Sequence, residues 1–158
     1  MGLDMYIKAS KHFPKIDWAK TTKNKYAISE GFVEVLAASK LEDVATDIYG
    51  ANVEVVAAYW RKANPVHNWF VKNVQDGTDD CAAYYLSIDK LRELAALCQK
   101  VIDEKSPHLL PPQEGFFFGN TDINQYYWDC LKDTIQQIDR ILLLPNLEEL
   151  HLEYQSSW

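Results

Sequence analysis

The sequence predicts an α+β fold, with a small, mostly antiparallel sheet and helices packed on one of its faces. Residues 3–9 and 147–155 alternate apolar and polar side chains, which is typical of half-buried strands. Residues 88–104 instead repeat apolar side chains at helical spacing, with a stripe that includes Leu91, Leu94 and Cys98. Because one-sided burial of strands is common in antiparallel sheets, we expect a single layer of helices over the apolar face.

Four strands are expected along the chain. Besides the first and last strands, residues 52–60 are rich in β-branched and aromatic side chains, and Tyr84–Leu86 form a short strand. Alternation in the first and last of these strands predicts that their polar side chains face away from the core. These side chains are Asp4, Tyr6, His151, Glu153 and Gln155.

Helices are expected at residues 29–38, 64–74, 88–104 and from 121 or 122 to 143, with one or two further turns within 41–48. Asn64 and Pro65 predict a helix start with asparagine as the cap and proline at the first position. Ser87 is the predicted cap of the next helix. Residues 10–25 are basic and irregular, and are expected to cross the surface without regular structure.

Composition narrows the classes of function. A chain of 158 residues with 47% hydrophobic residues is expected to form one folded domain, residues 1–158. A net charge of −7 disfavours a nucleic-acid polymer as partner, because such partners need a basic surface. No apolar run is long enough to predict a membrane span, and the first residues lack the pattern of a secretory signal. We therefore expect a cytoplasmic protein with three reduced cysteines, no CxxC pair and no zinc site.

The strongest candidate site is Tyr59–Phe70, with the sequence YWRKANPVHNWF. Arg61 and Lys62 follow a predicted strand and precede a helix N-terminus, whose N–H groups favour a phosphate or carboxylate. Trp60 offers a ring on which a base could stack, a contact of about 1–3 kcal/mol in nucleic-acid complexes. Asn64 and His67 are expected to orient such a ligand. The alternatives are that the cations are merely solvated, that Asn64 caps the helix, and that His67 is structural.

The second candidate stretch is QEGFFFG at residues 113–119, within a Pro-rich loop of residues 106–119. Loops of this length inside a compact domain are often functional. Three successive rings cannot all point into one core from an extended chain. Phe117 is therefore expected to face away from Phe116 and Phe118 and to contact the ligand, with core anchoring as the alternative. Gln113 and Tyr126 complete the predicted binding residues.

No catalytic motif supports a named reaction. The chain contains no P-loop, GxGxxG, HExxH or GxSxG pattern. We assign no catalytic residue, metal ligand or cofactor, and expect a binding protein rather than an enzyme. A hydrolase that uses His67, Asp80 or Glu114 as acid–base groups is the alternative.

Several long motifs resemble those of a family of small bacteriophage-encoded proteins without a settled biochemical role. They are GLDMY at residues 2–6, YWRKAN at 59–64, HNWFV at 67–71, DDC at 79–81, LLPPQEGFFFG at 109–119, the aromatic helix at 126–131 and YQSSW at 154–158. Residues 10–49 show little that matches, and no site is expected there.

The resemblance implies a phage origin and the cytoplasm of an infected bacterial host as location. Small phage accessory proteins often counter host defence, some by sequestering nucleotide-derived signals. We therefore expect an anti-defence protein that binds a small phosphate-bearing, nucleotide-like ligand. A protein–protein inhibitor of a host defence enzyme is the alternative, and a homo-oligomer is a further candidate assembly.

Overall fold

The computed structural model describes residues 2–44 and 49–158 and shows an α+β fold, as the sequence predicts. The chain divides into two compact units. Unit 1 comprises Met1–Ala9 and Val56–Trp158, and unit 2 comprises Ser10–Val55. The sequence pattern, which predicts one domain, gives no sign of this division.

Four strands form the described antiparallel sheet, in the order β2-β1-β4-β3. They are β1 (Asp4–Pro14), β2 (Gly50–Arg61), β3 (Tyr84–Tyr85) and β4 (His151–Ser157). Tyr84 pairs with Tyr154, and Tyr85 pairs with Glu153. The last strand of the chain therefore lies inside the sheet, while β2 and the much shorter β3 form its two edges.

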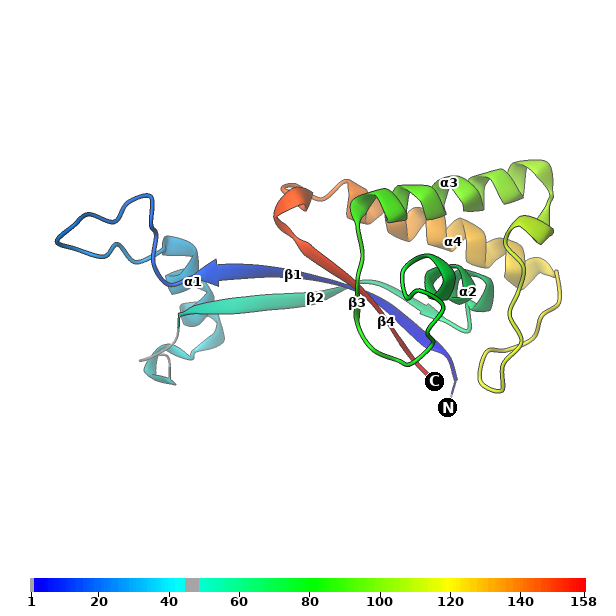
Figure 1. The fold of residues 1–158 in the computed structure, drawn as a ribbon, viewed down its shortest axis with the longest axis horizontal. Coiled ribbons are helices and arrows are strands. Elements are labelled where there is room, and N and C mark those ends of the chain that lie inside the picture. The colour runs from blue at the N-terminus through cyan, green and yellow to red at the C-terminus, as the bar shows by residue number, and fades with distance from the viewer. Residues whose placement is uncertain (1, 45–48) are drawn as a thin grey trace. The chain divides into compact units, whose positions relative to one another are not determined.

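Unit 1 packs its three helices against one face of the sheet. These helices are α2 (Asn64–Asn73), α3 (Ile88–Glu104) and α4 (Gln125–Leu142), with α3 and α4 lying side by side (Figure 1). Their apolar faces share a single core with the alternate strand residues Leu3, Met5, Ile7, Leu152 and Tyr154. Because side chains alternate across a strand, these residues belong to the same face of the sheet, which confirms the predicted one-sided layer.

Local capping chemistry sets two of the helix starts. Ser87 accepts a hydrogen bond from the backbone N–H of Lys90 at 3.3 Å, as predicted. The side chain of Asn124 accepts from the N–H of Tyr127, so α4 begins at Gln125 rather than at the predicted residue 121 or 122. The predicted apolar stripe of α3 is confirmed, since Leu91, Leu94, Cys98 and Val101 are buried.

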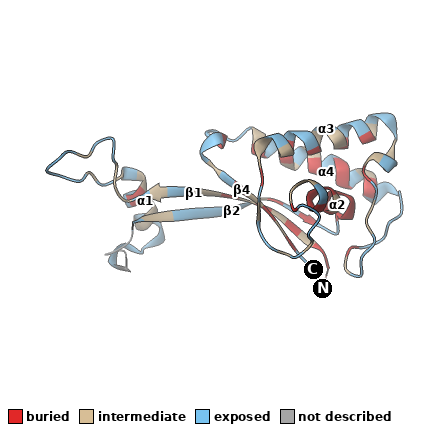
Figure 2. Cartoon of the chain, viewed as in Figure 1, coloured by how far each residue is buried: buried red, intermediate tan, exposed pale blue. Residues whose placement is uncertain are grey.

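Unit 2 contains α1 (Glu30–Ser39), a short 3₁₀ helix (Glu42–Val44) and the adjoining parts of β1 and β2. Phe32 is its only buried residue within the described part of the chain, and Figure 2 shows the scarcity of buried positions around α1. Gly50 lies so close to β1 that an added Cβ would sit 2.5 Å from the His12 ring.

Three further segments differ from their predictions. Residues 10–14 continue β1, so the prediction of an irregular segment there is wrong, because pairing between strands outweighs the lack of local alternation. Residues 147–149 form a 3₁₀ helix, and β4 begins only at His151. Of the helical turns predicted within 41–48, residues 42–44 form the 3₁₀ helix and 45–48 lie outside the described residues.

Candidate functional site

The predicted cationic residues line an open pocket of unit 1. Its volume is about 540 Å³, and its lining consists of Arg61, Lys62, Gly119, Asn120 and Tyr126. Three of these five residues belong to the predicted site. Gly119 ends the predicted GFFFG stretch, whereas no sequence signal pointed to Asn120.

A sharp turn of the backbone brings the two cations to this pocket. Arg61 ends β2, and the backbone N–H of Lys62 donates to the carbonyl oxygen of Leu3 at 2.7 Å. Lys62 then adopts a left-handed conformation with φ of 57°, which costs an ordinary residue about 1–2 kcal/mol. The chain thereby leaves the sheet and enters α2 within two residues.

Long-range hydrogen bonds hold the opposite wall of the pocket. The side-chain amide of Asn64 donates to the carbonyl oxygens of Phe118 at 3.0 Å and Asn120 at 2.9 Å. From α4, the hydroxyl of Tyr126 donates to the carbonyl oxygen of Arg61 at 2.6 Å. Burial raises the pKa of the Tyr126 hydroxyl, which keeps it protonated as this donor.

Gly119 allows the loop to approach Lys62 closely. Its φ is 92°, in the region that side chains disfavour, and an added Cβ would lie 3.4 Å from Cβ of Lys62. A larger residue here would be strained and would narrow the pocket.

The positive charge at the pocket is only partly compensated. The Arg61 guanidinium lies 3.9 Å from a carboxylate oxygen of Asp4, with 59% of its side chain exposed. The same Asp4 oxygen accepts from the Tyr59 hydroxyl at 2.5 Å. Lys62 is exposed and has no salt bridge within 4.0 Å to any residue that the structure describes. Exposed pairs at such distances contribute about 0–1 kcal/mol, so a bound anion could compete for both cations.

Trp60 does not lie on this surface. Its ring is 3% exposed and packs 6.3 Å from Phe70 in the core, so the prediction that it stacks on a ligand does not fit its burial. The reason is alternation along β2, which turns Trp60 inward and its neighbours Tyr59 and Arg61 outward.

Asn64 and the start of α2 are also buried. The N-cap position is Ala63 rather than the predicted Asn64, and no side chain caps this helix. Residues 63–67 are all buried, so the helix N-terminus does not open onto solvent as the predicted phosphate site requires. Asn64 instead positions the loop carbonyls at the pocket wall.

His67 is fully buried and bonded through both ring nitrogens. Nδ1 lies 2.7 Å from the Tyr154 hydroxyl, and Nε2 lies 3.0 Å from a carboxylate oxygen of Asp79. Because a carboxylate only accepts, Nε2 carries the proton and Nδ1 accepts from Tyr154. Burial lowers the pKa of His67 although Asp79 opposes this shift, so the ring is neutral. These contacts leave no nitrogen for a ligand or for acid–base catalysis.

The aromatic loop is arranged differently from the prediction. Phe118 is buried against the edge of the His67 ring, Phe117 is half-buried against the core, and Phe116 is 95% exposed. The ring that faces solvent is therefore Phe116, not Phe117. Gln113 is half-buried with its amide oxygen shielded from solvent, and it does not line the cationic pocket.

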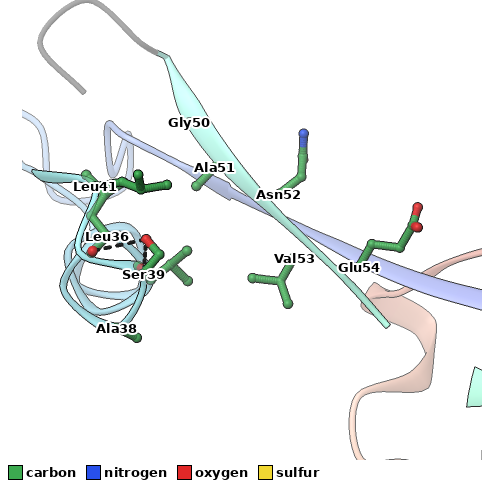
Figure 3. A pocket seen from close by; sticks show the side chains of 10 residues that line it. Leu36, Ala38, Ser39, Leu41, Gly50, Ala51, Asn52, Val53 and Glu54 are labelled. Carbon is green, nitrogen blue, oxygen red and sulfur yellow. Dashed lines mark hydrogen bonds between the residues drawn. The ribbon is translucent and has the colours of Figure 1, made fainter. Parts of the chain in front are cut away.

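A second, larger pocket lies within unit 2, where the sequence predicts no site. Its volume is about 680 Å³, and α1 and β2 form its walls (Figure 3). Most of the lining is apolar, with contributions from Val35, Leu36, Leu41, Ala51 and Val53. No sequence motif marks this pocket, whose lining comes from residues 35–54.

Within residues 2–44 and 49–158, no group of three or more histidine, cysteine, aspartate or glutamate side chains is placed to hold a metal ion. No helix in this part of the chain is long and apolar enough to cross a membrane. Comparison with known proteins identifies no relative: no family model, curated protein or solved structure matches the chain.

Proposed function

We propose that this protein is a phage accessory protein that sequesters a small phosphate-bearing, nucleotide-derived signal of host defence. The observation that carries the proposal is the pairing of two exposed cations, Arg61 and Lys62, with the half-exposed ring of Tyr126 around one open pocket. Phosphate oxygens match a guanidinium and an ammonium group, and an aromatic face suits a nucleobase. The motif resemblance supports the phage context.

The size and charge of the pocket favour a small ligand. A volume of about 540 Å³ lies within the range of about 300–1,000 Å³ that small-molecule sites occupy. A polymer would also have to approach a chain with a net charge of −7. A free dinucleotide or an ADP-ribose derivative is small enough to interact mainly with the positive charges of the pocket, because salt screens the more distant negative charges of the chain.

Calorimetry with cyclic dinucleotides and ADP-ribose derivatives tests binding. We expect one such ligand to bind, and Arg61→Ala to weaken it by about tenfold or more, since a charge-assisted contact is lost. Arg92→Ala is the matched control, because Arg92 has the same 59% side-chain exposure and also faces a carboxylate. No binding across the panel, or equal effects of the two substitutions, would contradict the proposal.

Paired substitutions of Tyr126 separate its two contributions. Tyr126→Phe keeps the ring but loses the hydrogen bond to the Arg61 carbonyl, whereas Tyr126→Ala also removes the stacking surface. We expect Ala to weaken binding about tenfold more than Phe. Ligand recovered intact after long incubation supports sequestration, and its cleavage would favour the hydrolase alternative.

One observation supports the alternative of a protein–protein inhibitor. Phe116 is 95% exposed in a loop whose neighbouring rings are anchored, and exposed aromatic anchors often dominate protein interfaces. A pull-down from infected cells distinguishes the two functions. A sequestering protein releases a small molecule on denaturation, whereas an inhibitor brings down a stoichiometric host protein that Phe116→Ala no longer retains.

A further inference from the structure

Unit 2 has too little core for the apolar surface it carries. Phe32 is its only buried residue within the described part of the chain. Meanwhile Val33, Leu41, Val53 and Val55 are between 40% and 55% exposed. Small units with so little buried surface usually need a partner, a metal or a disulfide to be stable.

Part of the exposed apolar surface of unit 2 lies beside an edge strand. Figure 3 shows Val53 extending from β2 on the side of α1, while Asn52 and Glu54 extend on the other side. Val53 and Leu41 both line the pocket of about 680 Å³ between these elements. A partner here would meet a strand edge and an apolar groove together.

The backbone of β2 offers hydrogen bonds along this edge. The N–H of Lys62 points toward β1, since it bonds to Leu3, whereas the N–H of Tyr59 points away and bonds to the side chain of Gln137. Alternation then directs the N–H and C=O groups of Val53 and Val55 outward as well. The side chain of Gln137 accepts from the N–H of Tyr59 at 2.8 Å and donates to its carbonyl oxygen at 2.9 Å. At Tyr59, the edge of β2 therefore has no free backbone groups for a further strand.

We infer that two copies of this chain associate through unit 2, with β2 of one copy pairing antiparallel with β2 of the other. The pairing extends the sheet across the two copies and brings the valines of each beside the apolar groove of the other. Because the arrangement is twofold, the exposed apolar surface of unit 2 is covered in both copies by the same contact.

Charge favours a second copy as the occupant. Residues 10–55 contain six lysines and seven aspartates or glutamates, so unit 2 is nearly neutral in a chain of net charge −7. Two such surfaces approach each other with little repulsion, whereas the rest of the chain repels its copy.

The register follows from the same residues. A twofold axis at Glu54 would place two carboxylates opposite each other, which is destabilising. An axis at Val53 instead places Asn52 opposite Glu54, pairs the outward groups of Val53 with those of its copy, and centres the pairing on a residue that lines the apolar groove, which Val55 does not. We therefore assign the axis to Val53.

The test is the mass of the full chain in solution by light scattering and sedimentation over a range of concentrations. We expect the wild type to reach twice 18.2 kDa. Val53→Lys should raise the dissociation constant by about tenfold or more, because it places two ammonium groups opposite each other. Tyr85→Lys is the matched control on the opposite edge strand, where the side chain is 66% exposed, and it should leave the dimer intact.

Val55→Pro provides a second variant that preserves the sheet within one copy. Its missing N–H is one that points outward, and proline is tolerated on strand edges in that orientation. Hydrogen exchange of wild type should show the amides of Val53 and Val55 gaining protection as concentration rises. A chain that is monomeric at all concentrations, or a dimer that survives both substitutions without such protection, would overturn the inference.

Discussion

The two units differ in how many of their apolar residues are buried in a core. In unit 1, strand alternation and helical stripes combine into one core that includes Leu3, Phe70, Leu91, Leu131 and Tyr154. In unit 2, apolar residues are just as evident in β2, but Val53 and Val55 remain 40% and 55% exposed. The difference shows that apolar pattern alone does not produce a core. Burial needs a second layer, and unit 1 has one in α2, α3 and α4.

The largest expected difference between the units concerns their aromatic anchors. Phe70 is fully buried and stacks on Tyr154 at 3.9 Å between ring centroids. Phe70→Ala should lower the free energy of unfolding by about 3–5 kcal/mol, from lost contacts and the cavity left behind.

Phe32→Ala in unit 2 is the counterpart, and we expect a smaller loss because Phe32, although buried, lies outside the large core that contains Phe70. Chemical denaturation of both variants, followed by circular dichroism, measures the comparison. Equal losses would mean that unit 2 contributes to global stability as strongly as unit 1 does.

The second prediction concerns pH and applies to unit 1. The folded-state pKa of His67 is lowered by burial, so the unfolded chain binds more protons between that pKa and the unfolded value of 6.5. Stability should therefore be fully present above pH 6.5, fall as the pH drops, and level off below the folded pKa. The slope reaches at most about 1.4 kcal/mol per pH unit.

Urea unfolding between pH 8 and pH 5 measures this slope. His67→Gln should remove the contribution, although it also weakens the bonds to Asp79 and Tyr154. The exposed His108 supplies the control, and His108→Gln should keep the slope. A slope that survives His67→Gln would point to another group.

The smallest prediction compares the two serines that precede α1 and α3. Ser87 accepts a hydrogen bond from Lys90, whereas Ser29 makes no capping hydrogen bond with its side chain. Ser87→Ala should therefore cost about 1 kcal/mol, and Ser29→Ala only a few tenths. Thermal unfolding of the two variants checks this difference, and a larger loss at Ser29 would contradict the geometry.

Sequence reasoning succeeded where the structure depends on near neighbours. The cap at Ser87, the buried stripe of α3 and the alternation of β4 all follow from residues a few positions apart. It failed at Asn64, whose pattern is that of a helix cap. Its amide instead bonds to the Phe118 and Asn120 carbonyls, more than fifty residues away along the chain.

The candidate site shows the same limit. The sequence predicts Arg61, Lys62 and Tyr126 as binding residues, and all three line one pocket, but composition does not separate them from Trp60 and His67. Only the direction of each side chain makes that distinction. His67 is polar and lies in the same stretch of sequence as the cations, yet its ring bonds to Tyr154 of β4.

The position of β4 within the sheet has a consequence for synthesis. This strand is the last element of the chain, yet it lies between β1, which is nearly the first, and β3. While a ribosome is still making residues 151–157, Leu3, Met5 and Ile7 have no neighbouring strand on that side. The nascent chain must therefore keep an apolar surface in contact with water, or with a chaperone, until residues 151–157 have emerged from the ribosome. The emergence of residues 151–157, rather than the emergence of any helix, is the step that allows the sheet to close.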